Sequence, residues 1–248
     1  MKIYGKNPVL ERLKADPKSI RHIFVEVGHA EQRYISMKAK KHGIPVSIVP
    51  SSKMLKLGRS QNTQGLLMDV ADFAYVDYDD LMDEALASGV TLVFLDGITD
   101  PQNFGAILRT LACLGGFAVV IPTHGSVDVT DTVTRVACGG ENYVKIAKVN
   151  NLNNAIEKAK SKGFWIAGTV LRDGEDVSRA KLPFPLGLVV GSEAKGIRDI
   201  TMSRLDVKLT VPMAQVRLAL NASHATTIFC YEIKKQKDQI PAKKQSIA

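Results

Sequence analysis

The sequence predicts an α/β protein with two units, a small N-terminal one and a larger one built on a mostly parallel sheet. From residue 91 onward, apolar segments typical of strands alternate with helical segments, which is the pattern of a parallel sheet covered on both faces. The segment 91–95 is apolar throughout, as strands buried on both sides are. The charge changes sign near residue 75, and we therefore expect two domains, residues 1–75 and 76–248.

Composition excludes several classes of protein. The chain has 248 residues, 45% of them hydrophobic and 23% charged, a balance typical of globular rather than disordered proteins. No stretch approaches the roughly 18 apolar residues that a membrane-spanning helix needs, and the first residues lack the apolar core of a signal peptide. The three cysteines lie far apart, so we expect no disulfide framework and a cytoplasmic location.

The net charge of +8 is unevenly distributed. Residues 1–75 hold 13 Lys and Arg against 6 Asp and Glu, whereas residues 76–100 hold none against 7. A basic N-terminal unit is typical of proteins that bind a polyanion, and RNA and DNA are the obvious candidates. A solvated basic surface without a partner is the alternative explanation.

Local signals place the elements of the N-terminal unit. Asn7-Pro8 marks a helix start, and Ser51-Ser52 is expected to cap another short helix that ends near Gly58. The expected helices are 6–13, 30–42 and 51–58, and the expected strands are 22–27, 46–49 and 66–71.

In the larger unit, Asp100 and Pro101 stand in the order of a helix cap and a first helical residue. The expected helices are 79–87, 103–114, 129–137, 151–162 and 219–235. The expected strands are 91–95, 117–121, 164–170, 186–190 and 207–211, and the last residues are expected to be frayed.

The usual nucleotide-binding and hydrolase fingerprints are missing. No two glycines are two residues apart, which excludes G-x-G-x-x-G, and neither a P-loop nor a G-x-S-x-G elbow occurs. The five histidines are scattered without metal-ligand spacing, so we expect no metal.

Three other segments carry unusual chemistry, and the first is 96–110, DGITDPQNFGAILRT. It begins at the end of a buried strand, where parallel sheets bind ligands. Arg109 lies about 140° around the helix from Phe104, off the apolar stripe, and Gly105 is expected to leave room over it. A guanidinium with space beside it suits a phosphate, and an ordinary exposed arginine is the alternative.

The other two segments each follow a strand. In 186–198, LGLVVGSEAKGIR, Gly191 lets a ligand approach the backbone and Glu193 follows it. In 209–223, LTVPMAQVRLALNAS, Pro212 ends strand pairing and Asn221 lies beside a helix start, where asparagine is most often a cap.

Together the three segments resemble the SpoU–TrmH family of S-adenosylmethionine-dependent RNA ribose 2′-O-methyltransferases. The family pattern is an Asn and an Arg on the first helix, a G-S-E-x-x-G loop and an I-P-M…S-L-N-x-S ending. The corresponding residues here are Asn103, Arg109, Gly191, Ser192, Glu193, Gly196, Val211, Pro212, Met213, Leu220, Asn221 and Ser223. The resemblance covers nearly the whole chain, because residues 1–75 are similar to the family's ribosomal-protein-like RNA-binding domain. It implies a SPOUT-type α/β trefoil knot and a homodimer with the catalytic site at the subunit interface.

The resemblance also implies roles for individual residues. The implied catalytic residues are Arg109, Asn103, Glu193 and Asn221, with Arg109 holding a phosphate beside the reacting 2′-hydroxyl and Glu193 holding either Arg109 or an amide of the cofactor loop. The implied S-adenosylmethionine-binding residues are Gly191, Val211, Leu220, Thr169 and Met213.

The combination of domains most resembles the branch that modifies 23S ribosomal RNA. Two residues depart from the family pattern, since Ala219 stands where the family has a serine and Gln215 where a glycine is common. The alternatives are a tRNA ribose 2′-O-methyltransferase and an RNA-binding homologue with impaired catalysis.

Overall fold

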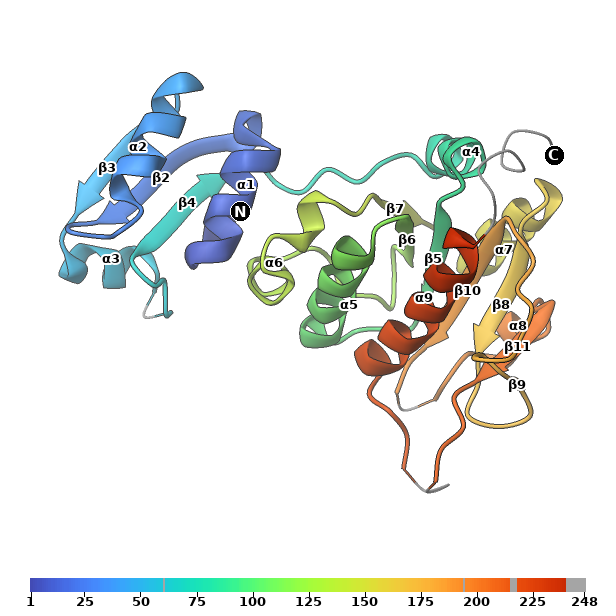
Figure 1. The fold of residues 1–248 in the computed structure, drawn as a ribbon. Coiled ribbons are helices and arrows are strands. Elements are labelled where there is room, and N and C mark those ends of the chain that lie inside the picture. Colours follow the sequence, from blue (N-terminus) through green and yellow to red (C-terminus); the bar gives the residue numbers. More distant parts are fainter. Residues whose placement is uncertain (60, 194, 215–217, 240–248) are drawn as a thin grey trace.

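The structure, a computed structural model, describes residues 1–59, 61–193, 195–214 and 218–239. Figure 1 shows an N-terminal unit and a C-terminal unit joined by an extended segment, residues 71–77. No helix in these residues has the length and apolar character needed to cross a membrane.

The N-terminal unit is a four-stranded sheet of order β1-β4-β2-β3. β2 runs parallel to β3, whereas β4 runs antiparallel to both β1 and β2. Side chains of α1 and α2 pack on one face of this sheet, and α3 packs on the other. The strands are β1 (Lys2–Tyr4), β2 (Ile20–Glu26), β3 (Val46–Val49) and β4 (Leu66–Val70), and the helices are α1 (Lys6–Ala15), α2 (Gln32–Lys41) and α3 (Ser51–Leu57).

The C-terminal unit is a seven-stranded sheet of order β7-β6-β5-β10-β8-β11-β9, in which every pair of neighbours is parallel. Every residue of β5 and β6 is buried, as the apolar run at 91–95 predicted. The strands are β5 (Thr91–Asp96), β6 (Phe117–Pro122), β7 (Ile146–Val149), β8 (Trp165–Thr169), β9 (Glu175–Asp176), β10 (Leu186–Gly191) and β11 (Val207–Thr210).

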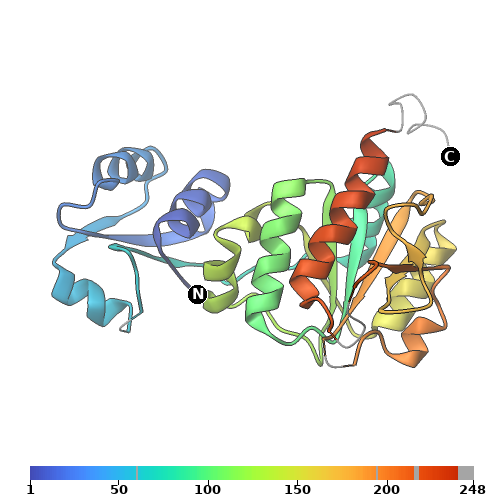
Figure 2. The ribbon, with the colours of Figure 1, turned by 60° about the horizontal axis from the view of Figure 1, so that its bottom comes forward.

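Helices cover both faces of this sheet, which confirms the predicted layering (Figure 2). One face packs against α5, α6 and α9, and the other against α4, α7 and α8. Their bounds are α4 (Tyr78–Ser88), α5 (Pro101–Leu114), α6 (Asp131–Ala137), α7 (Leu152–Ser161), α8 (Asp199–Met202) and α9 (Ala222–Asp238). Because the chain leaves β5 toward β6 on one side and β10 lies on its other side, the strand order reverses there, and ligands of such sheets bind at the carboxyl ends of the strands around this point.

Some elements were not predicted, and some bounds differ. The unpredicted strands β1, β7 and β9 and helix α8 have two to four residues each, too few to show a period in the sequence. The three strands also pair with partners far along the chain. The predicted Ser51-Ser52 cap is wrong: Pro50 is the cap residue, and the Ser51 hydroxyl donates to Glu26. Asp100 and Pro101 do begin α5 as predicted, and the Asp100 carboxylate accepts from Gln102 N.

A buried charge pair joins the two units. The side chains of Arg12 on α1 and Glu141, in the 3₁₀ turn Gly140–Asn142, are 7% and 0% exposed, and Arg12 Nη2 donates to Glu141 Oε1 at 3.4 Å. Burial raises the pKa of the Glu141 carboxyl, and the neighbouring Arg12 acts in the opposite direction. Lys2 N also donates to Asp131 Oδ1 across the same contact, at 3.0 Å. The N-terminal unit therefore docks on α6 and the turn that follows it.

Gly105 serves helix packing rather than a ligand, which corrects the expectation of open space over Arg109. A Cβ atom at Gly105 would lie 2.6 Å from Val136 Cβ and 2.9 Å from the Val133 carbonyl oxygen. α6 therefore occupies that space, and the missing side chain lets α5 and α6 approach closely.

We expect Gly105→Ala to destabilise the fold by about 1–3 kcal/mol, because overpacking outweighs the roughly 1 kcal/mol that alanine normally adds in a helix. Urea denaturation measures the difference. Asn154→Ala, at an exposed position on α7, is the matched control and should be neutral or slightly stabilising. A Gly105→Ala protein more stable than wild type would contradict this account of the contact.

Candidate active site

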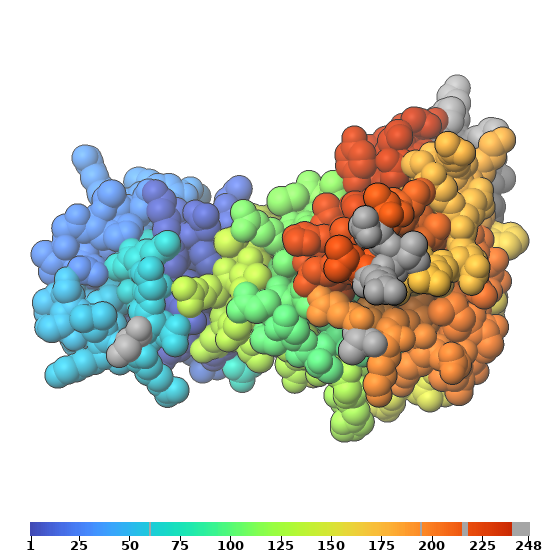
Figure 3. Space-filling model, turned by 90° about the horizontal axis from the view of Figure 1, so that it is seen from below, coloured from blue at the N-terminus to red at the C-terminus, as the bar shows by residue number. Residues whose placement is uncertain are grey.

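A pocket lies at the carboxyl ends of β8 and β10, beside the segment after β11 and the start of α9. All five residues expected to bind the cofactor line it, namely Thr169, Gly191, Val211, Met213 and Leu220. Apolar groups such as Phe229 and Val190 form much of the remaining wall. Figure 3 shows the end of the molecule where the 190s and the residues leading into α9 lie side by side. Three segments far apart in sequence thus form one apolar pocket at a strand-end position.

Gly191 allows the pocket loop to fold on itself. A Cβ atom there would lie 2.2 Å from the Gly196 carbonyl carbon and 2.3 Å from Ile197 N, so the loop backbone fills the space that the sequence suggested was for a ligand. Ser192 and Gly196 close the turn with reciprocal backbone hydrogen bonds of 3.1 and 2.8 Å. Gly196 has a φ of 67°, the left-handed conformation that favours glycine. The G-S-E-x-x-G spacing is therefore the requirement of a tight loop.

Asp96 fixes this loop to the central strand. The Asp96 carboxylate is buried at the end of β5 and accepts from Arg198 Nε at 2.7 Å and Arg198 N at 3.1 Å. The sequence did not indicate this pair, although Asp96 lies in the segment 96–110 and Arg198 in the segment 186–198. A carboxylate directly after a buried apolar run was the available signal, because such a group needs a partner.

The Glu193 carboxylate joins three segments. Its Oε1 accepts from Asn103 Nδ2 on α5 at 3.0 Å, from Asn221 Nδ2, and from Ala222 N at the first turn of α9 at 3.2 Å. Asn221 Nδ2 also donates to Asn103 Oδ1 at 2.7 Å. Three of the four expected catalytic residues therefore meet beside the pocket, and Glu193 holds the Ala222 amide at the start of α9 rather than Arg109.

Asn221 is the N-terminal cap of α9, as its position suggested. Its Oδ1 accepts from Ser223 N at 2.9 Å and from the Ser223 hydroxyl at 2.6 Å. Both ends of this amide are thus engaged, one by the helix and one by Glu193 and Asn103. Ala219 lines the pocket, whereas Gln215 lies outside the described residues.

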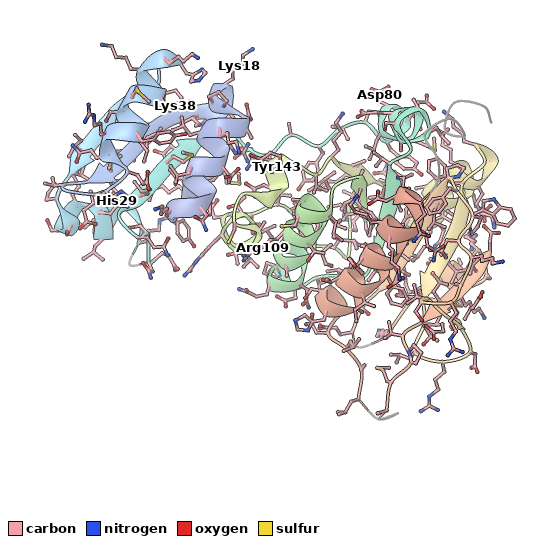
Figure 4. The ribbon with its side chains drawn as sticks, in the orientation of Figure 1. Lys18, His29, Lys38, Asp80, Arg109 and Tyr143 are labelled. Carbon is pink, nitrogen blue, oxygen red and sulfur yellow. The ribbon has the colours of Figure 1, made fainter. Side chains whose placement is uncertain are left out.

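Arg109 does not contact these three residues. It is exposed on α5, and its Nη1 lies 3.5 Å from the Sγ atom of Cys138 at the end of α6. Six residues separate it from Asn103, which amounts to about 9 Å along the helix and about 120° around it. Figure 4 shows Arg109 beside α6, toward the N-terminal unit. Within one chain, the guanidinium therefore points away from the pocket.

The described residues contain no group of three His, Cys, Asp or Glu side chains that could hold a metal ion. The pocket instead offers apolar walls, backbone groups and one carboxylate, which suits an organic ligand with polar ends.

Two family models match the chain. Residues 90–231 match the SpoU rRNA methylase family, and residues 2–76 match the model for RNA 2′-O ribose methyltransferase substrate binding. The first covers more than half of the chain, and the two together cover both units.

Curated relatives and solved structures agree with these models. An uncharacterised tRNA/rRNA methyltransferase from Synechocystis is 35% identical over 95% of this chain, which spans 62% of that relative's length. A Bacillus subtilis protein assigned to the TrmH family of tRNA/rRNA methyltransferases is 34% identical over 96% of both chains. The crystal structure of an AdoMet-bound rRNA methyltransferase from Sinorhizobium meliloti shares the fold, with a TM-score of 0.77 and 21% identity over 94% of this chain and 86% of that one.

We predict that Asn221→Asp destabilises the protein by about 1 kcal/mol, although aspartate is normally as good a helix cap as asparagine. The substitution removes the amide that donates to Glu193 and places a second carboxylate against it. Urea denaturation at neutral pH measures the change.

Asn151→Asp is the matched control, because Asn151 caps α7 with the same kind of bonds and has no such carboxylate contact. It should be neutral. Combining Asn221→Asp with Glu193→Gln should recover most of the loss, because the repulsion is removed. Equal effects of the two cap substitutions would show that the Glu193 contact contributes nothing.

Proposed function

Because the chain belongs to the SpoU rRNA methylase family, we propose that it transfers a methyl group from S-adenosylmethionine to a ribose 2′-hydroxyl of RNA, with ribosomal RNA as the substrate. Family membership establishes the coarser activity, that of an RNA methyltransferase that uses S-adenosylmethionine. The proposal rests on one observation above all, the pocket lined by Glu193, whose carboxylate is held by the Asn103 and Asn221 side chains beside it.

Two further observations support the finer assignment. The substrate-binding model at residues 2–76 is that of RNA 2′-O ribose methyltransferases, which favours ribose over base. The structure of the rRNA methyltransferase from Sinorhizobium meliloti aligns with 94% of this chain, which favours ribosomal RNA as the substrate. We assign RNA substrate binding to residues 1–75 and methyl transfer to residues 76–248, with the trefoil knot of the family in the loops around the pocket.

The pocket residues fit S-adenosylmethionine. Val211, Met213 and Leu220 offer apolar contact for an adenine ring, and the backbone around Gly191 offers polar groups for the ribose and the amino acid. When bound, the cofactor supplies an electrophilic methyl group on a sulfonium, which a 2′-oxygen attacks in line as the carbon–sulfur bond breaks. No metal is required for such a displacement, and positioning supplies most of the catalysis.

Arg109 is assigned the electrostatic part of the reaction. An arginine guanidinium keeps its proton at physiological pH, so it cannot act as the base. It can instead hold the phosphate next to the target ribose and stabilise the negative charge that develops on the 2′-oxygen as its proton leaves to solvent.

We propose that a second copy of the chain completes the active site. Within one chain, Arg109 contacts Cys138 and does not line the pocket, which supports a site formed by the pocket of one protomer and Arg109 of its partner. The resemblance implies a homodimer of this kind. Exposed Tyr231 on α9 and exposed Leu218 and Leu220 beside the pocket give this region apolar surface that a partner subunit would cover.

The direct test uses methyl-labelled S-adenosylmethionine with ribosomal RNA from cells that lack the gene. We expect label in the RNA, and we expect the bond 3′ to the modified ribose to resist alkaline cleavage, since a methylated 2′-oxygen cannot attack the phosphate. Incorporation without such resistance would show base methylation. Binding of both substrates without transfer would favour the impaired homologue that Ala219 suggests.

Arg109→Ala should lower methyl transfer about 10²-fold while leaving S-adenosylmethionine affinity unchanged, because a lost electrostatic donor acts on the transition state. Arg109→Lys should not restore the rate, since an ammonium cannot make a planar two-pronged contact. Arg179→Ala, whose side chain is 85% exposed, is the matched control and should retain the wild-type rate.

The shared site has its own signature. Co-expressing Arg109→Ala with Glu193→Ala should give hybrid dimers in which one site has both wild-type residues, and random pairing then restores about a quarter of wild-type activity. A mixture as inactive as its two components would exclude the shared site.

A further inference from the structure

A groove runs between the N-terminal unit and α6, away from the pocket. Its lining includes Lys2, Tyr4, Arg21, Arg59 and Gln61 of the N-terminal unit, and Asp131 at the start of α6. Three of these six side chains are cationic, and we call this feature the α6 groove.

Arg135 borders the α6 groove from the side of the C-terminal unit. Its guanidinium lies 5.5 Å from the centroid of the Tyr4 ring, and its Nη1 donates to Gln61 Oε1 at 3.3 Å. An exposed arginine over a half-buried aromatic ring is a surface on which nucleic-acid bases and phosphates both find contacts.

The groove leads toward Arg109. Cys138 lies three residues after Arg135, on the same side of α6, and its Sγ atom is in contact with Arg109 Nη1 at 3.5 Å. Figure 4 shows Arg109 at this inner side of the C-terminal unit. Arg59, Arg135 and Arg109 thus mark a path from the N-terminal unit to the guanidinium assigned to the target phosphate.

These cations have no carboxylate partners among the described residues. No ion pair is formed there by Lys2, Arg21, Arg59 or Arg135. In the N-terminal unit, by contrast, Lys6 and Arg12 do form ion pairs. Asp69 and Asp131 are the acidic groups of the lining, and Asp131 already accepts from Lys2 N. The groove therefore carries an excess of positive charge that is available to phosphates.

We propose that the α6 groove binds the backbone of the substrate RNA strand that leads to the methylated nucleotide, with Arg135 and Arg59 as phosphate-binding positioning residues. This inference rests on the proposed RNA methyltransferase function and adds the route by which the substrate reaches Arg109. It also explains why the N-terminal unit is fixed on α6 rather than tethered loosely, since a continuous groove needs a fixed junction.

The test measures binding of the full-length protein to a fluorescently labelled RNA hairpin over a salt series. Arg59→Ala and Arg135→Ala should each lower affinity about 5-fold and reduce the slope of log affinity against log salt by about 1, as expected for one lost phosphate contact. KM for RNA should rise with kcat nearly unchanged, because these residues position the strand and do not touch the reacting atoms.

Two controls separate charge from structure. Gln61→Ala removes the bond to Arg135 across the groove but no charge, so it should keep the wild-type salt slope. Arg179→Ala removes an exposed charge on the far edge of the sheet and should keep both affinity and slope.

The proposal is overturned if Arg59→Ala and Arg135→Ala bind the hairpin with the wild-type slope, or if Gln61→Ala reproduces their loss. It is also overturned if an acidic peptide binds the groove and the RNA hairpin does not. If the wild-type protein methylates ribosomal RNA and the Arg59→Ala and Arg135→Ala variants bind the hairpin like the wild type, only the role of the groove is refuted. Wild-type protein that binds the hairpin but methylates no RNA would refute the function instead.

Discussion

The architecture of the site depends on one carboxylate, that of Glu193, which accepts hydrogen bonds from two distant segments and so joins them to its own loop. Glu193 receives the Asn103 amide from α5, the Asn221 amide from the cap of α9 and the backbone amide of Ala222. These segments lie about 90 and 30 residues away along the chain, and none of them could fix the pocket alone. The buried Asp96 holds the other end of the same loop through Arg198, so the loop is fixed at both ends. A pocket built in this way is preorganised before any ligand arrives, which is what catalysis by positioning requires.

The geometry of α5 places Asn103 and Arg109 on two different surfaces of the chain. The helix period places Asn103 toward the pocket and Arg109 toward α6, so one helix contributes to two different surfaces. A methyl donor in the pocket and an RNA strand along α6 would meet only where two protomers come together. In the proposed dimer, assembly, cofactor binding and RNA binding are linked, because each would supply part of one shared site.

Much of this could be predicted from the sequence, because the long periodic segments and the family motifs carry strong local signals. The alternation that begins at 91, the Asp100-Pro101 helix start and the Asn221 cap were all confirmed, as was the family resemblance. Apart from the Ser51-Ser52 cap, what failed were inferences about empty space. Gly105 and Gly191 suggested room for a ligand, yet their missing side chains accommodate α6 and the loop backbone. Sequence shows that a side chain is absent, but tertiary packing decides what fills the gap, and likewise which distant residues flank short strands such as β7.

The buried Arg12–Glu141 pair also constrains how such proteins diverge. Two charges held out of water at a junction stabilise the pairing only when both are present, and removal of one partner leaves the other at a cost of about 3–5 kcal/mol. A chimaera that combined one of these units with a unit lacking the partner residue would keep one buried charge without its partner, and the junction would be destabilised. The two units can therefore be exchanged for those of another protein only together with both members of this pair.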